Sequence, residues 1–128
     1  MNKINFNPNY YASVKLEEPE NSFEVIKKML TKNKNISAII CSTEFSALSA
    51  IKACNYLNYK IGKDISIITF DGALVRDLSS PPITAVSFPV KELGKRAINI
   101  LLDKNKNQTV NYLAKSEIIE RGSVHIVS

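Results

Sequence analysis

The most constraining feature of this chain is an apolar run over residues 65–70, which ends directly at Asp71 and Gly72. Short runs rich in isoleucine are typical of strands that are buried on both faces of a parallel sheet. In open sheets of this kind, ligands bind just beyond the carboxyl ends of the strands. The run alone leaves two interpretations of Asp71 open. Its carboxylate faces a ligand, or it only stabilises the turn after the strand, where aspartate is common.

The rest of the chain alternates predicted strands and helices. Short alternating or apolar segments predict four more strands, over residues 12–17, 36–41, 83–88 and around 117–120. Apolar residues at helical spacing predict three helices, over residues 19–32, 43–57 and 89–102. This order predicts an α/β fold with a mostly parallel sheet and helices on both of its faces.

Length and charge limit the class of protein. A chain of 128 residues suits one domain with one core. No apolar run approaches the roughly 20 residues that span a bilayer, and the first residues lack an apolar core of signal-peptide length. We therefore expect a cytoplasmic protein without membrane contact. The net charge of +5 comes from scattered lysines without a basic arm, which indicates solvated helix faces and not a nucleic-acid surface.

The residues that usually carry chemistry are few. The four glycines form neither a P-loop nor a dinucleotide fingerprint. Cys41 and Cys54 lie in apolar segments and are interpreted as small buried hydrophobic residues without a disulfide. His125 is the only histidine, so neither a zinc site nor a pair of nucleophile and base is apparent. We expect no enzyme activity, no metal and no cofactor.

Polar side chains follow three of the predicted strands. Glu17 and Glu18 come at the end of the first, Thr43 and Glu44 come after the second, and Asp71 follows the third. Because the carboxyl ends of parallel strands share one edge, these groups would line a rim that suits a polyhydroxylated ligand. The alternative is that Thr43 only caps the next helix while Glu44 complements its dipole. Both roles can coexist.

Five segments, in this order, resemble those of a known family. Residues 37–48 resemble a segment that usually ends in Asn-Asp-x-x-Ala, residues 63–72 resemble a Pro-x-Asp-Val-Ser-Val-x-Gly-Phe-Asp-Asp run, and residues 81–86 resemble Pro-Pro-Leu-Thr-Thr-Val. Residues 89–97 are similar to the helix start that follows, and residues 120–123 resemble a terminal Arg-x-Ser signature. Together, over about residues 16–124, they resemble the C-terminal part of the effector-binding domain of LacI/GalR-type bacterial transcription regulators. That domain has the type I periplasmic-binding-protein fold.

The resemblance implies a division of the chain and roles for four residues. Residues 1–128 would form part of the effector-binding domain. Its second subdomain would comprise about residues 12–88 and 110–124, and the helix at about 89–104 would belong to a first subdomain that is mostly missing. Asp71 would accept hydrogen bonds from the effector, and Thr43 and Glu44 would form a polar and acidic pair against it. Glu17 falls near a position that often holds an aromatic ring stacked on the effector.

The function implied is the effector-sensing portion of a transcription regulator that binds a small sugar or nucleoside-like ligand. Operator DNA would be contacted only by a headpiece that these residues do not include, and the regulator would be a homodimer. One alternative is a solute-binding protein of the same fold. A second, less favoured, is a phosphoacceptor receiver domain, because it leaves residues 81–84 and 120–123 unexplained. Its acidic pair, phosphoacceptor, threonine and lysine would be Glu17, Glu18, Asp71, Thr84 and Lys91.

The last predicted helix raises a packing question. Its apolar face must be buried, because exposed patches of that size attract partners. We expect the helix to pack back on its own sheet or against a second copy of the chain. The residues of this face are Leu93, Ala97, Ile98 and Leu101.

Overall fold

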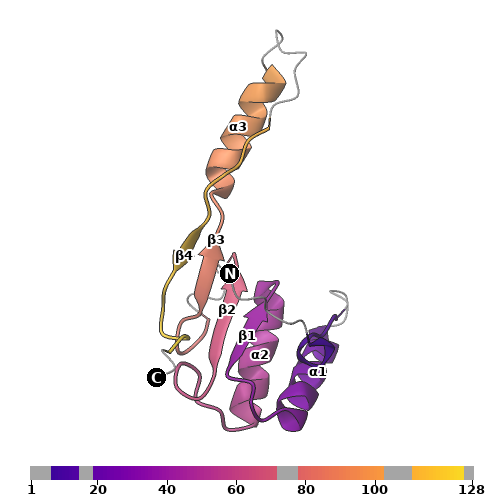
Figure 1. Cartoon of the computed structure of the whole chain (residues 1–128). Coiled ribbons are helices and arrows are strands. Elements are labelled where there is room, and N and C mark those ends of the chain that lie inside the picture. The colour runs from indigo at the N-terminus through magenta and orange to yellow at the C-terminus, as the bar shows by residue number, and fades with distance from the viewer. Residues whose placement is uncertain (1–6, 15–18, 72–77, 103–110, 126–128) are drawn as a thin grey trace.

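The computed structural model of this chain describes residues 7–14, 19–71, 78–102 and 111–125 (Figure 1). A short 3-10 turn at Pro8–Tyr10 precedes the main elements. The helices are α1 (Pro19–Lys32), α2 (Glu44–Tyr56) and α3 (Val90–Leu102). The strands are β1 (Ala38–Cys41), β2 (Ser66–Phe70), β3 (Thr84–Ser87) and β4 (Glu117–Ile119).

The four strands form one sheet in the order β1-β2-β3-β4. Strands β1, β2 and β3 are parallel, and β4 joins β3 antiparallel. The α/β class and the mostly parallel sheet are therefore confirmed. Asn58, which follows α2, has a φ of 61°, the left-handed conformation that ends helices.

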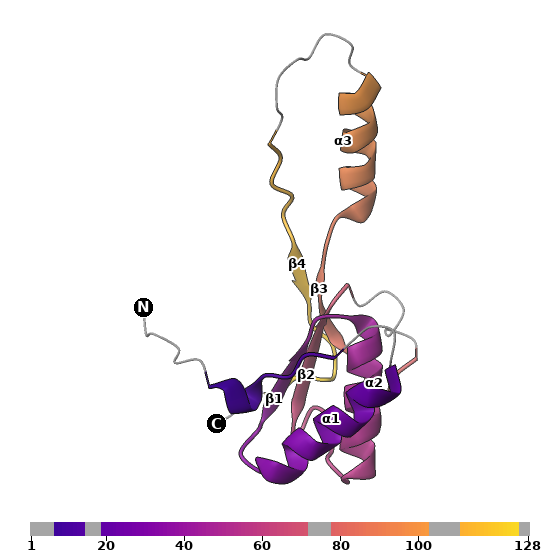
Figure 2. The same ribbon diagram turned by 90° about the vertical axis from the view of Figure 1, so that its right-hand side faces the viewer.

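The helices do not cover both faces of the sheet, contrary to our expectation. Helix α2 packs on β1 and β2, and α1 packs on α2 on the same side (Figure 2). The reason is that the third helix, α3, makes no substantial contact with the described strands. Within the described residues, no helix covers the opposite face, where Ile40 is 73% exposed. The core lies between α2, the inner side of α1 and one sheet face. Its fully buried residues include Leu30, Ala47, Ala50, Cys54, Ile65 and Ile67.

The first predicted strand, over residues 12–17, is not observed where the structure describes it. Residues 11–14 have no regular secondary structure, and residues 15–18 lie outside the described part of the chain. In the sheet that is described, β1 is an edge strand. Alternation within six residues predicted an extended conformation, but pairing requires a neighbouring strand at the right distance, which the alternation does not specify.

The C-terminal segment is held against the sheet by buried hydrogen bonds. Ser123, which is fully buried, accepts a hydrogen bond from the Thr84 N–H at 2.8 Å and donates to the Ile67 carbonyl at 2.6 Å. The Arg121 guanidinium donates to the Ile83 carbonyl at 2.5 Å. Gly62, with a φ of 77°, leaves space for this segment, because a Cβ there would lie 2.1 Å from the Gly122 oxygen. The motif at residues 120–123 therefore has a structural role.

Helix α3 projects away from the sheet, and one of our two expectations for it is wrong. It makes no substantial contact with the described strands, so it does not pack back on its own sheet (Figures 1 and 2). Its apolar side chains are exposed, Ile98 by 57% and Leu101 by 83%. Arg96 stacks on the ring of Tyr112 at 3.9 Å, so the returning segment covers part of the polar side. The chain between β3 and α3 runs outward, away from the core.

Candidate functional site

Asp71 lies at the carboxyl end of β2 in a special backbone conformation. Its φ is 69°, in the left-handed region, and its side chain is exposed. Its N–H donates to the Val86 carbonyl of β3 at 2.9 Å, which ties the residue to the neighbouring strand. A left-handed non-glycine residue costs about 1–3 kcal/mol and persists where its surroundings hold it, often at functional sites. Aspartate tolerates this conformation better than most residues.

Thr43 and Glu44 follow β1 and begin α2. The Thr43 hydroxyl accepts a hydrogen bond from the Ser46 N–H, and the Ser46 hydroxyl accepts one from the Thr43 N–H, both at 3.2 Å. This reciprocal capping box confirms the predicted helix cap. Glu44 is half-buried in the first turn of the helix, where a negative charge complements the dipole. The capping role of Thr43 is therefore established, and its hydroxyl also lies 2.7 Å from the Ser46 hydroxyl.

The strand register brings these residues to one edge. Cys41 pairs with Thr69 in the register of β1 and β2, so Thr43 and Asp71 each lie two residues beyond a matched pair. Glu117 of β4 lies at the same edge, because it pairs with Ser87 of β3. Sequence reasoning missed Glu117, because only the antiparallel return of β4 brings the start of that strand to the carboxyl ends of the others.

Two aromatic rings at this edge were also missed. Phe70 and Phe88 are 37% and 41% exposed, and their rings stack with centroids 6.1 Å apart and an interplanar angle of 12°. Phe70 is level with Val86, and Phe88 lies two residues further along, so the alternation of side chains puts both rings on one face. That alternation was a signal available in the sequence. Together with Asp71, the edge offers a carboxylate beside exposed aromatic surface.

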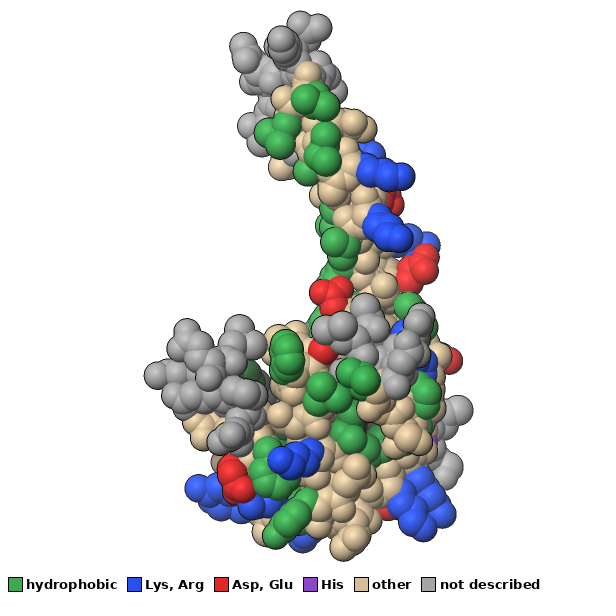
Figure 3. All heavy atoms as spheres, turned by 180° about the vertical axis from the view of Figure 1, so that it is seen from behind, with side chains coloured by type: hydrophobic (Ala, Val, Ile, Leu, Met, Phe, Trp, Pro, Cys, Tyr) green, Lys and Arg blue, Asp and Glu red, His purple; other side chains and the backbone are tan. Residues whose placement is uncertain are grey.

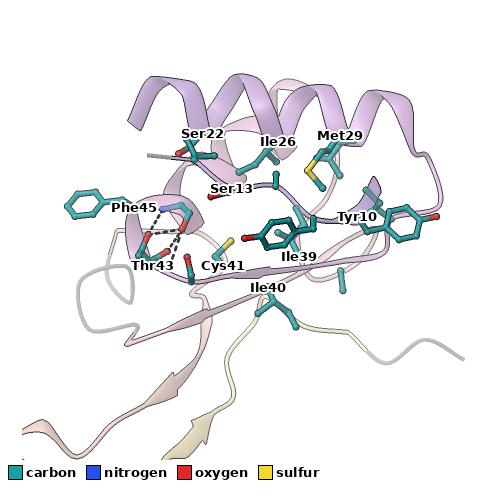
Figure 4. Close-up of a pocket in the computed structure, with 18 of the residues that line it drawn as sticks. Tyr10, Ser13, Ser22, Ile26, Met29, Ile39, Ile40, Cys41, Thr43 and Phe45 are labelled. Atoms are coloured by element: carbon teal, nitrogen blue, oxygen red, sulfur yellow. Dashed lines mark hydrogen bonds between the residues drawn. The ribbon is translucent and has the colours of Figure 1, made fainter. Parts of the chain in front are cut away.

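Glu17, the fourth predicted site residue, lies outside the described residues. The described chain just before it, Tyr10–Val14, lines a cavity of about 780 Å³ with α1 and β1. Figure 4 shows this segment passing between α1 and β1, with Thr43 at one end of the cavity. Asp71 does not line this cavity. The structure therefore brings Thr43 to both the cavity and the sheet edge, and keeps Asp71 at the edge alone.

The described residues contain no group of three or more histidine, cysteine or acidic side chains that could hold a metal ion. His125 does hydrogen-bond to the Ser66 hydroxyl at 3.0 Å, a pair that sequence reasoning missed. It lies at the amino end of β2, opposite to Asp71, and it anchors the C-terminal segment. No helix in the described part of the chain is long and apolar enough to cross a membrane.

Comparison with known proteins identifies the family. Residues 2–124 match the periplasmic binding protein-like domain. The repressor PurR of Haemophilus influenzae is 30% identical over 118 residues, 91% of this chain and 35% of PurR, and it is named an HTH-type transcriptional repressor. The HTH-type transcriptional regulator RegA of Clostridium saccharobutylicum is 31% identical over 117 residues, 89% of this chain and 34% of RegA. The chain spans about a third of the length of these relatives.

Solved structures agree on the fold. A LacI family regulator from Bifidobacterium animalis subsp. lactis superposes with a TM-score of 0.72 at 26% identity, over 86% of this chain and 41% of that one. The regulator CelR, solved as a complex with cellobiose, superposes with a TM-score of 0.83 at 15% identity, over 94% of this chain and 37% of CelR. The chain therefore belongs to the family of periplasmic binding protein-like domains, and its relatives there are LacI-type transcriptional regulators.

Proposed function

We propose that this chain is the effector-sensing portion of a transcription regulator, and that a small sugar or nucleoside-like molecule binds at the carboxyl edge of its sheet. The observation that carries the proposal is Asp71, an exposed carboxylate held in a left-handed conformation where β2 ends. The relatives support it, because PurR and RegA are named HTH-type regulators and CelR was solved with cellobiose. They favour a regulator over a solute-binding protein or a receiver domain.

The chemistry of the edge suits such a ligand. The Asp71 carboxylate would accept hydrogen bonds from hydroxyl or ring N–H groups, and a fixed acceptor selects ligands by the position of their donors. The hydroxyl of Thr43 and the carboxylate of Glu44 would complete the polar side. Phe70 and Phe88 present aromatic surface against which the apolar face of a sugar or a base can pack. Glu17 would contribute a further carboxylate.

The effector would act by shifting a conformational equilibrium. A ligand changes the population of two arrangements only by as much as its affinity for them differs. The chain spans about a third of its curated relatives, so we place the second wall of the site in the rest of such a protein. Operator DNA would then be bound through a headpiece, in a homodimer whose subunit geometry the effector changes.

The test is a titration of the isotope-labelled chain followed by two-dimensional NMR. The probes are cellobiose, lactose, ribose, adenosine and guanine. We expect one class to shift the amide signals of Thr43, Glu44 and Asp71. Asp71→Asn keeps the shape and tolerates the left-handed conformation, but removes the charge. It should weaken binding about 10- to 100-fold, because a hydrogen bond to a charged group contributes roughly 1.5–3 kcal/mol.

The matched control is Asp64→Asn, the same change near the amino end of β2. Asp64 accepts a hydrogen bond from the Lys60 N–H at 2.7 Å, and an asparagine oxygen can replace that acceptor. This variant should bind as the parent chain does. Equal affinity of Asp71→Asn and the parent would exclude Asp71 from the site, and shifts confined to other residues would move the site elsewhere.

A further inference from the structure

Both connections between helix α3 and the sheet start at a single residue pair. Strand β3 ends at Ser87 and β4 begins at Glu117, and these two residues pair in the antiparallel register. One connection leads outward from Ser87 through residues 88–89 to α3, and the other returns along residues 111–116 (Figure 1). We call α3 and residues 111–116 the α3 arm. Its orientation therefore depends on what holds these two connections relative to each other.

Packing on the sheet does not fix the α3 arm. Helix α3 makes no substantial contact with the described strands, and nearly all of its side chains are exposed. The outgoing connection enters the helix directly, because the Val90 N–H donates to the Phe88 carbonyl at 2.8 Å. A helix that is held at one end by one short connection can still rotate about that connection. A fixed orientation therefore requires a second attachment.

Three side chains, which we call the clasp, join the helix to the returning segment. The Tyr112 hydroxyl donates a hydrogen bond to the Glu92 carboxylate. The Arg96 guanidinium lies over the Tyr112 ring, 3.9 Å from its centroid. Glu92 is in the first turn of α3 and Arg96 follows one turn later, so both side chains lie on the same side of the helix. One contact holds the hydroxyl and the other holds the ring face, so the clasp fixes both the position and the plane of the ring.

The exposure of Tyr112 reflects these contacts. Tyr112 is 37% exposed, whereas the next residue, Leu113, is 95% exposed. A hydrogen bond to a carboxylate is charge-assisted and stronger than one between neutral groups, and an arginine over a tyrosine ring is attracted by the electrons of the ring face. Both interactions are directional, so they oppose rotation of the α3 arm as well as separation of its two sides.

The clasp closes a small ring of chain next to the carboxyl edge of the sheet. The ring runs from Ser87 to Glu92, crosses to Tyr112 through the hydrogen bond, and returns to Glu117, which pairs with Ser87. Two connections that are joined at both ends have fewer conformations than two separate ones, because each restricts the backbone of the other. The ring therefore supplies the second attachment that α3 needs.

The same ring contains two residues of the carboxyl edge. Phe88 follows Ser87, and its side chain stacks on that of Phe70 with centroids 6.1 Å apart. Phe70 directly precedes Asp71, and Glu117 lies on the other side of the ring. A change in the orientation of the α3 arm would therefore move Phe88 and Glu117 relative to Asp71.

We propose that the clasp fixes the orientation of the α3 arm relative to the sheet, and that Tyr112 is thereby a positioning residue for Phe88 and Glu117. The first part depends only on the contacts within the arm. The second part rests on the proposed function, because it concerns an effector bound at the carboxyl edge. Such an effector binds more tightly when these residues are already in place, since less conformational freedom is lost on binding.

Residual dipolar couplings of the isotope-labelled, full 128-residue chain test the first part. In the parent chain we expect the couplings of α2, β2 and α3 to fit one alignment tensor, as those of a single rigid body do. Tyr112→Leu removes both the hydroxyl and the ring, so α3 should then require a tensor of its own. Tyr112→Phe keeps the ring for Arg96 and should have an intermediate effect. All samples are compared at one concentration and in one oligomeric state.

Titration of the Tyr112 phenol tests the contacts of the clasp directly. The hydrogen bond to Glu92 is the main cause that raises the pKa of Tyr112 above its ordinary value, while the charge of Arg96 lowers this pKa. NMR of the labelled ring should therefore show a lower pKa of Tyr112 in Glu92→Gln and a higher one in Arg96→Met. Opposite shifts are specific to the clasp, because a general loosening of the arm would lower the pKa in both variants.

The carboxyl edge itself tests the second part. Tyr112→Leu should shift the amide signals of Phe88 and Glu117. Among cellobiose, lactose, ribose, adenosine and guanine, the probe that binds the parent chain should bind this variant about threefold more weakly or worse, as expected if the competent population falls to about a third. Tyr56→Phe, a change at a tyrosine of α2 that is 67% exposed, is the control and should alter none of these measurements.

The first part is wrong if α3 requires its own tensor in the parent chain, or if Tyr112→Leu leaves the single fit intact. Unchanged signals of Phe88 and Glu117 in a variant with a loosened arm would overturn the second part. If none of the probes binds the parent chain, the proposed function fails, whereas the dipolar couplings and the amide signals still decide both parts about the arm. Circular dichroism checks that each variant folds, and Tyr112→Phe serves where Tyr112→Leu does not.

Discussion

At the scale of single residues, the functional and structural roles separate clearly. Among the described residues, Asp71 makes a backbone hydrogen bond to β3, and its side chain is exposed. Ser123 is fully buried, and its hydroxyl joins β2, β3 and the C-terminal segment. Both residues occur in segments by which the family was recognised. The burial of Ser123 shows that its segment contributes to stability. The exposure of Asp71 and its φ of 69° favour a binding role for that residue.

Ser123→Ala should destabilise the fold by about 1–3 kcal/mol. The substitution leaves the N–H of Thr84, a residue only 2% exposed, without its acceptor, and a buried unpaired donor carries this cost. The measurement is urea unfolding followed by circular dichroism. Ser42→Ala, at an exposed serine, is the control and should change stability by less than about 0.5 kcal/mol. Equal effects of the two substitutions would show that the Ser123 hydroxyl does not stabilise the fold.

The two buried thiols should make stability fall at alkaline pH. Burial raises the pKa of Cys41 to about 12, with a further contribution from Cys54, and burial raises the pKa of Cys54 to about 11. The ordinary value is 9.0. Above pH 9 the unfolded chain loses these protons before the folded one does, so stability present below pH 9 is lost as pH rises towards 11 and 12.

The free energy of unfolding should fall by about 1.4 kcal/mol per thiol for each pH unit in that range. Urea unfolding at several pH values between roughly 8 and 10.5 would measure this decrease. The variant with both Cys41→Ala and Cys54→Ala should show a flatter dependence on pH, although its stability at neutral pH is lower. An identical slope in this variant and the parent would assign the loss to other groups.

At the scale of the elements, α3 is the helix that the described residues do not bury. It is strongly amphipathic, yet nearly all of its side chains are exposed. Figure 3 shows apolar side chains on the arm that contains α3, with basic side chains displaced to one side. The apolar residues recur at helical spacing, so the pattern that predicted the helix also predicted a partner for one of its faces.

We expect that a second copy of the chain covers this face in solution. Sedimentation velocity over a range of concentrations should show a dimer that dissociates on dilution. Ile98→Glu together with Leu101→Glu places charges on the apolar face and should give a monomer. Asn99→Glu places one such charge on the opposite side of the helix and should leave the dimer intact. A parent chain that stays monomeric with α3 exposed would contradict the expectation.

At the scale of the whole molecule, the chain exposes far more surface than a compact protein of its size. Its accessible surface is 10163 Å², whereas a compact monomer of 14.3 kDa exposes roughly 6,800 Å². Two features of the described residues contribute to this area, the projecting α3 arm and the sheet face opposite α2, where Ile40 and Ile118 are exposed (Figure 2).

Local physics therefore determined much of this protein from its sequence. The boundaries of α1, α2 and β2 follow from side-chain periodicity, from the capping box at Thr43 and from the left-handed Asn58, and each depends only on residues within a few positions. The position of Asp71 at the carboxyl edge of the sheet was predicted in the same way, because it requires only that a parallel strand ends just before this residue.

Tertiary structure alone decided the remaining features, because they depend on residues distant in the sequence. Whether residues 12–14 form a strand depends on what lies beside β1, and whether α3 is buried depends on a surface that the described residues do not supply. Glu117 reaches the carboxyl edge only because β4 returns antiparallel, and Ser66 meets His125 only across the folded sheet. Periodicity specifies which face of an element is apolar, but only the three-dimensional arrangement specifies what covers that face.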